Sequence, residues 1–379
     1  MSLSLGTDKK SSKFATIQVD AGDGSVGTVT IDRSSWLPTQ METEQYGRAM
    51  ILKLQWGEEL GDRVMLKNVD VIDGGKVKIK WQVERARFLE SAPDFTQPND
   101  SLRIVFDRDM SPKLKVKKAS GGHFLVRPLI HGKDLGWFLF DTGASGTIID
   151  IKLAKKLEMQ RIGETYSTGI GGRSATQLFV AESLQLGGVR IENVPISSRD
   201  FSKKKSSYGV EIAGILGVDL LAQGIIVYDE SEVEVEFHVP DTFKLPRGEW
   251  DKMPIHNGKP AIRMEYEGHV GLFMIDTGAP GRLIFSPQAS ERNLLLKGRK
   301  TKRTRVSGGG GSVGALTGTI DYVVFGGKRF EKIPALFLVE NEGAGADVLS
   351  DGIVGANLVR RFVVVFDIEG ERIAYLPRE

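Results

Sequence analysis

The heptapeptide Phe-Leu-Phe-Asp-Thr-Gly-Ala at residues 138–144 returns almost unchanged as Phe-Met-Ile-Asp-Thr-Gly-Ala at residues 273–279. In both copies an apolar run ends in a carboxylate, a hydroxyl and a glycine. A buried strand that stops in this way presents its acid at the strand end, on a turn whose glycine permits a tight backbone. Either triplet alone would be typical of an ordinary turn after a core strand. The repetition is therefore the informative observation.

Other short segments recur in the same order after each triplet. They are Leu-Gly-Gly at 186–188 and Phe-Gly-Gly at 325–327, Gly-Ile-Leu-Gly at 214–217 and Gly-Ile-Val-Gly at 352–355, and a strand–turn–strand pattern at 224–237 and 362–376. The spacing between the two copies changes by only a few residues along the chain. Because chance similarity would not preserve both order and spacing, we infer an internal duplication.

The duplication predicts the domain organisation. We expect one lobe at residues 113–245 and a second at 246–379, preceded by an N-terminal β-rich domain of unknown role at 1–112, which matches neither copy. The 45 glycines and many short β-branched runs indicate a mainly β chain with tight turns. Short helices are expected from Asp150 and from Ser286, where Ser followed by Pro is a favourable helix start.

Composition excludes several classes of protein. The chain has no cysteine, which rules out disulfide scaffolds, thiolate zinc sites and a cysteine nucleophile. None of the five histidines is spaced as a helical metal site requires, so we expect no metal and no cofactor. The formal net charge of +2 gives no global field for nucleic acid, and no apolar run approaches the ~18 residues of a membrane span.

The paired Asp-Thr-Gly-Ala segments, each followed by a Gly-apolar-apolar-Gly segment, resemble the two half-sites of an aspartic protease. The alanine after each triplet and the short lobes are more similar to the retropepsin-like branch, here as a tandem, single-chain form. The resemblance covers residues from about 115 to 379. It implies a bilobed fold of acid-protease-like β-barrels, with the two acids meeting at the lobe junction.

The resemblance also implies a role for each residue of the triplets. Asp141 and Asp276 would be the catalytic pair of an endopeptidase that cleaves peptide or protein substrates. Thr142 and Thr277 would form crossed hydrogen bonds beneath the pair, and Gly143 and Gly278 would support it. Two carboxylates in contact cannot both ionise, so they share one proton. One then activates a water molecule while its partner protonates the scissile carbonyl, without a metal or a covalent intermediate.

A glycine-rich turn lies between each triplet and its Gly-apolar-apolar-Gly segment. From the resemblance we predict that Gly169, Ile170, Gly171 and Gly172 form a flap over the substrate. The corresponding turn at 307–312 is compatible with a second flap or with a flexible loop. The family's bacterial members are often exported, which favours a periplasmic or extracellular location, with the leader absent from this sequence.

Three alternatives stay open at this point. One chain is sufficient for one site, but the lobes could instead form active pairs only by homodimerisation. The chain could also be a non-catalytic peptide-binding module that keeps the protease fold. Finally, the basic cluster at 297–305 could form a rim that selects acidic peptides or contacts nucleic acid, or it could be ordinary solvated surface.

Overall fold

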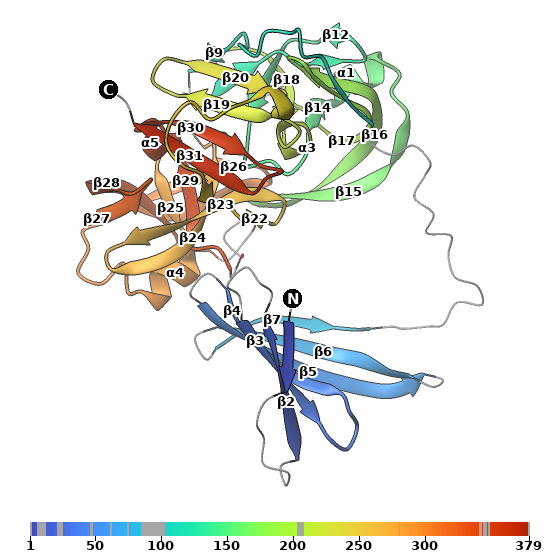
Figure 1. The fold of residues 1–379 in the computed structure, drawn as a ribbon, viewed down its shortest axis with the longest axis vertical. Coiled ribbons are helices and arrows are strands. Elements are labelled where there is room, and N and C mark those ends of the chain that lie inside the picture. The colour runs from blue at the N-terminus through green and yellow to red at the C-terminus, as the bar shows by residue number, and fades with distance from the viewer. Residues whose placement is uncertain are drawn as a thin grey trace. The chain divides into compact units, whose positions relative to one another are not determined.

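The computed structural model describes residues 2–5, 13–20, 26–45, 48–60, 63–73, 76–84, 103–120, 122–202, 208–279, 281–340, 343, 347 and 349–377. The chain divides into two compact units, Met1–Thr96 and Gln97–Glu379, and each is described by itself (Figure 1). The first unit does not contain the duplicated sequence. The second contains both copies.

The N-terminal unit is a single antiparallel sheet in which every strand pairs with its neighbour in sequence. Its strands are β1 (Ser2–Leu5), β2 (Phe14–Asp20), β3 (Val26–Asp32), β4 (Pro38–Gln45), β5 (Arg48–Leu60), β6 (Arg63–Asp73) and β7 (Lys76–Gln82). Met50, Val69 and Val71 are its buried apolar side chains among the residues described, whereas Trp36 is 70% exposed. This unit is β-rich, as the alternating sequence predicts.

The first copy forms a lobe built on one mixed sheet. Its elements are β8 (Arg103–Phe106), β9 (Lys117–Lys118), β10 (Phe124–Val126), β11 (Leu129–Ile130), β12 (Lys133–Asp134), β13 (Trp137–Phe140), β14 (Ile148–Asp150), α1 (Ile151–Lys156), β15 (Arg161–Gly169), β16 (Gly172–Leu186), β17 (Val189–Arg199), β18 (Ile212–Leu216), α3 (Val218–Leu221), β19 (Ile225–Asp229) and β20 (Glu234–His238). A short 3-10 turn, η1 (Pro240–Thr242), follows in the segment between the lobes. Strand β8 pairs with β17, so residues 103–106 belong to this sheet although the predicted lobe begins at residue 113.

The second copy repeats this arrangement. Its elements are β21 (Asp251–Lys252), β22 (Ile255–His256), β23 (Lys259–Tyr266), β24 (His269–Asp276), β25 (Leu283–Phe285), α4 (Pro287–Arg292), β26 (Lys302–Gly308), β27 (Gly311–Phe325), β28 (Lys328–Leu338), β29 (Gly352–Gly355), α5 (Ala356–Val359), β30 (Phe362–Asp367) and β31 (Arg372–Pro377). Strand β23 pairs with both β24 and β27, which closes this sheet into a barrel. Closure leaves few unpaired strand edges.

The same strand pattern surrounds both Asp-Thr-Gly segments. In the first lobe the strands lie in the order β13, β18, β14 and β17. The pair β13–β18 is parallel, β18–β14 is antiparallel, and β14–β17 is parallel. In the second lobe β24, β29, β25 and β28 have the same order and directions. The duplication in the sequence is therefore a duplication of topology. The predicted fold class, a mainly β protein with two acid-protease-like lobes, is confirmed.

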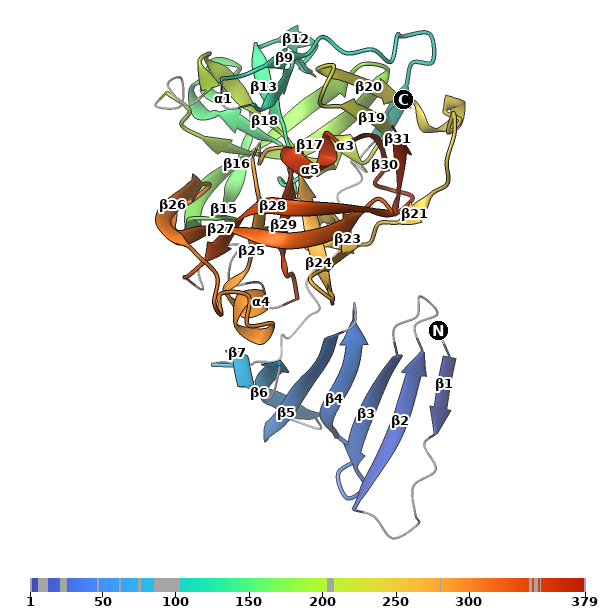
Figure 2. The same cartoon turned by 90° about the vertical axis from the view of Figure 1, so that its left-hand side faces the viewer.

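The two lobes share a sheet and a core. Strand β19 of the first lobe pairs with β30 of the second, in a five-stranded sheet of order β20-β19-β30-β31-β21 (Figure 2). These are the strand–turn–strand segments that end the two copies. Buried side chains from both lobes, including Tyr228 and Phe366, belong to one hydrophobic cluster. Burial of this apolar surface holds the lobes together as one unit.

Both predicted helices are present and begin as expected. Asp150 caps α1, its carboxylate accepting a hydrogen bond from the Lys152 N–H at 2.8 Å. Ser286 caps α4 by accepting from the Ala289 N–H, and Pro287 occupies the first helical position. These short helices follow β14 and β25, the strands beside the Gly-apolar-apolar-Gly segments.

Candidate active site

Each Asp-Thr-Gly segment is held in place by the Gly-apolar-apolar-Gly segment of its own lobe. The backbone N–H of Asp141 donates to the carbonyl of Leu216 at 3.1 Å, and the carbonyl of Ala144 accepts from the Val218 N–H at 2.9 Å. In the second lobe the Ala279 carbonyl accepts from the Ala356 N–H at 3.0 Å. The similar distance in sequence between each Asp-Thr-Gly segment and its Gly-apolar-apolar-Gly segment thus reflects a chain length that places the second segment beside the first.

The two threonines connect the lobes directly. The Thr142 hydroxyl donates to the Ile275 carbonyl at 2.7 Å and accepts from the Thr277 N–H at 3.1 Å. The Thr277 hydroxyl donates to the Phe140 carbonyl at 2.9 Å and accepts from the Thr142 N–H at 3.0 Å. Both side chains are fully buried, at 0% and 1% exposure. Four buried hydrogen bonds therefore fix one triplet against the other.

The glycine of each triplet faces the aspartate of the other lobe. A Cβ atom on Gly143 would overlap the carboxyl group of Asp276, and one on Gly278 would overlap that of Asp141. Any larger side chain would push the opposite acid away. Absence of a side chain at these two positions is what lets each carboxyl group approach across the lobe junction.

The carboxyl groups of Asp141 and Asp276 interact with one another at this junction. Burial, followed by the charge of Asp276 and a side-chain hydrogen bond with it, raises the pKa of Asp141 well above its ordinary value. Burial also raises the pKa of Asp276. Oδ1 of Asp276 is buried and has no hydrogen-bond donor within the described part of the chain. A proton shared by the two carboxyl groups would satisfy this atom and remove one of two adjacent charges.

A lysine side chain lies near the pair. Lys259, the first residue of β23, acts to lower the pKa of both Asp141 and Asp276. The turn just before it packs on the first lobe, because a Cβ on Gly258 would lie 3.4 Å from the Cβ of Ser145. A cation at this place favours retention of one negative charge on the pair.

The glycine-rich turns form the tips of two long hairpins that meet one another. The hairpin β15–β16 ends at Gly169–Gly172, and β26–β27 ends at Gly308–Gly311 (Figure 2). The Gly171 N–H donates to the Gly309 carbonyl at 2.9 Å. A Cβ on Gly171 would overlap the backbone of Gly311. The turn at 307–312, left open by the sequence, is therefore a second hairpin tip.

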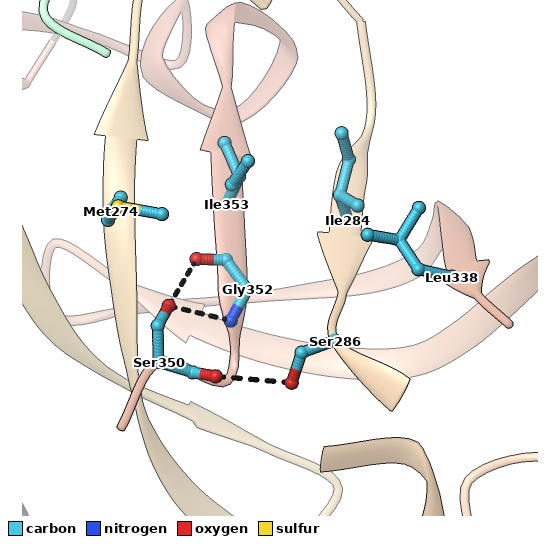
Figure 3. Close-up of a pocket in the computed structure, with 7 residues that line it drawn as sticks. All are labelled: Met274, Ile284, Ser286, Leu338, Ser350, Gly352 and Ile353. Atoms are coloured by element: carbon cyan, nitrogen blue, oxygen red, sulfur yellow. Dashed lines mark hydrogen bonds between the residues drawn. The ribbon is translucent and has the colours of Figure 1, made fainter. Parts of the chain in front are cut away.

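The first hairpin tip also contacts the second lobe. Ile170 packs against a small cluster that contains Met274, Ile284 and Val313, with Ala279 of the acidic loop beside it. Members of this cluster also line a cavity of about 10 Å³, whose walls are Met274, Ile284, Ser286, Leu338, Ser350, Gly352 and Ile353 (Figure 3). This volume is about that of one water probe, so the cavity is too small for a substrate.

Several residues at the site could not be found from the sequence. Lys259 and His123 carry no motif; His123 lies near the backbone of Gly278, and burial lowers its pKa. Tyr208 lies close enough to Asp141 for that carboxylate to contribute, after burial, to raising the pKa of the phenol. Only the fold brings these side chains to the acidic loops.

Two β-lobes with an aspartate pair at their junction define an aspartic-protease-like fold and site. The aspartyl protease family matches the chain twice, at residues 126–220 and 262–358, which is just over half of its length. The chain belongs to this family, and the double match confirms the tandem organisation that the repeated triplets predict.

The other comparisons add little to this assignment. A retropepsin-like aspartic protease from Rickettsia conorii is similar to this chain at 17% identity, over 36% of this chain and 96% of that chain, with a TM-score of 0.25. No curated protein matches the chain significantly. Among the described residues, no helix is long and apolar enough to cross a membrane.

Proposed function

We propose that the chain is an aspartic endopeptidase in which Asp141 and Asp276 form one catalytic pair within a single molecule. The observation that carries this proposal is the set of crossed hydrogen bonds of Thr142 and Thr277, which hold the two triplets against each other. An intramolecular pair needs no second copy of the chain. Homodimerisation is therefore not required for this site.

The proposed reaction uses the shared proton of the pair. The ionised carboxylate removes a proton from a water molecule, whose oxygen attacks the scissile carbonyl carbon. The protonated carboxyl donates its proton to the carbonyl oxygen, which gives a tetrahedral diol. As the C–N bond breaks, the carboxyl that took the proton of water gives it to the leaving amine, and one hydroxyl of the diol passes its proton to the other carboxylate, so the pair ends with the single proton it began with. Burial raises the pKa values of both groups, and the charge of Asp276 raises that of Asp141 further, so the pair keeps its proton to a higher pH than an ordinary carboxyl group would.

The hairpin tips would act as two flaps in this scheme. Gly169, Ile170, Gly171 and Gly172 are proposed to cover the substrate together with the tip of the β26–β27 hairpin. The contact between the two tips supports this role, since it spans from one lobe to the other. Glycines allow the tips to approach backbone to backbone, and the tips must separate to admit a peptide.

A peptide-library digest read by mass spectrometry tests the proposal. We expect cleavage by the natural chain and none by the Asp141→Asn or Asp276→Asn variants, with all three showing the same circular dichroism spectrum. A mixture of the two variants separates the intramolecular pair from a dimeric one. Recovery of activity on mixing would show that each site is built from two chains. Absence of any cleavage by the natural chain, with peptide binding retained, would indicate a binding module instead.

A further inference from the structure

An open, basic groove lies on the second lobe, between the loop after the second triplet and the base of the β26–β27 hairpin. Its volume is about 660 Å³. Its walls carry Arg282, Lys300, Lys302 and Arg303, together with threonine, glycine and proline residues. No carboxylate is among the residues that line it. The groove therefore concentrates positive charge on a chain whose net charge is only +2.

Within the described residues, none of these four cations forms an ion pair. The neighbouring carboxylates are already engaged elsewhere: Glu267 pairs with Arg299 at 2.7 Å, and Asp321 pairs with Lys332 at 2.7 Å. Like charges that share a groove repel one another, and an anion bound among them would relieve that repulsion.

The first lobe provides an internal comparison. The two hairpins can be aligned on the last strand pair before each tip, Gly169 with Gly172 and Gly308 with Gly311. In this alignment Glu164 corresponds to Arg303, and Gly163 corresponds to Lys302. Arg161, on the far side of a register shift in β15, forms an ion pair with Glu164. The same surface of the first lobe is thus charge-balanced. The basic groove is a property of the second lobe, and the common fold does not require it.

The groove is bounded by two elements of the proposed active site. Arg282 follows Asp276 by only six residues, on the loop that carries the acid. Lys302 and Arg303 stand at the base of the hairpin whose tip meets the first flap. At about 3.3 Å per residue, the seven residues of β26 span roughly 20 Å, the length of six residues of extended peptide.

We propose that this groove is an exosite for an acidic segment of the protein substrate, about six residues from the scissile bond. The proposal rests on the proposed function, and it adds the substrate's chemistry: a run of Asp and Glu beside the cleaved sequence. Charge complementarity favours an anionic partner. An acidic peptide is favoured over single-stranded nucleic acid because the groove has no aromatic lining residue on which bases could stack.

A binding experiment tests the groove without relying on catalysis. A fluorescein-labelled hexaglutamate peptide is titrated with the Asp141→Asn chain, and hexaglutamine serves as the neutral probe. The groove variant carries Lys300→Gln, Lys302→Gln and Arg303→Gln, and the matched variant carries Lys152→Gln, Lys155→Gln and Lys156→Gln on α1. Both sets are exposed and lose the same charge. We expect about tenfold weaker hexaglutamate binding in the groove variant, as three exposed charge contacts would give, and less than twofold in the matched variant.

Three results would overturn the proposal. The first is that hexaglutamate does not bind. The second is that both triple variants weaken hexaglutamate binding equally. The third is that a single-stranded RNA oligonucleotide binds more tightly than hexaglutamate and that its binding depends on the groove residues. The last would make the groove a nucleic-acid site.

A kinetic experiment connects the groove to cleavage. Two peptides share one cleaved sequence, and one of them carries an acidic extension six residues from the bond, placed on either side in turn. We expect the natural chain to prefer the acidic peptide through a lower KM, and the groove variant to lose this preference. Equal kcat/KM for both peptides in the natural chain would refute the exosite. If neither peptide is cleaved, the proposed function fails, and the binding experiment still decides the groove.

Discussion

Replacement of Thr142 by valine is the sharpest test of how the site is assembled. Valine has nearly the same shape, so packing is kept, but the hydroxyl is lost. The change leaves the buried Ile275 carbonyl without its donor and the buried Thr277 N–H without its acceptor. Each unsatisfied buried group costs about 1–3 kcal/mol, so we expect the free energy of unfolding to fall by about 2–6 kcal/mol. A domain in the middle or upper part of the usual stability range of about 5–15 kcal/mol would remain folded.

Urea unfolding followed by intrinsic fluorescence measures this loss, and Thr142→Ser is the matched control. Serine keeps the hydroxyl and removes one methyl group, which costs only about 0.8 kcal/mol. Peptide cleavage should fall at least tenfold in the valine variant and be largely retained in the serine variant. If valine and serine variants unfold at the same urea concentration and cleave equally well, the crossed hydrogen bonds do not hold the acidic pair together.

Three further predictions concern the same site. Gly143→Ala should abolish cleavage because its methyl group overlaps the Asp276 carboxyl. Gly146→Ala should be active in the same assay, because its methyl group would meet only Oδ2 of Asp219, at an ordinary contact distance of 3.8 Å. Asp141→Asn should raise the melting temperature at pH 7. Because the pKa of Asp141 is raised in the folded state, folding takes up a proton, and the natural chain loses stability as the pH rises above the unfolded-state pKa of about 4. Calorimetry at several pH values should show the difference in melting temperature between the two chains vanish near pH 4. Gly171→Ala should lower kcat/KM while changing the melting temperature little, because it disturbs the contact with Gly311 at the hairpin tips; unchanged kinetics would argue against paired flaps.

Local features of the chain were predictable because they depend on neighbouring residues. The apolar runs that end at Asp141 and Asp276 form strands β13 and β24, and the caps at Asp150 and Ser286 begin α1 and α4. The duplication was visible because both lobes use the same strand–turn segments at similar spacing. The catalytic roles of the triplets and the predicted boundaries at residues 112 and 245 stay predictions.

Only the tertiary structure decided which groups meet. Asp141 lies beside Asp276 of the same chain because β19 pairs with β30 and because both lobes share one core. Lys259 approaches the pair from a turn that has no motif, and the basic groove joins Arg282 to residues some 20 positions further along. Strand ends, turns and caps follow from short-range backbone chemistry, whereas these contacts arise from burial of apolar surface between segments distant in sequence, which no local pattern encodes.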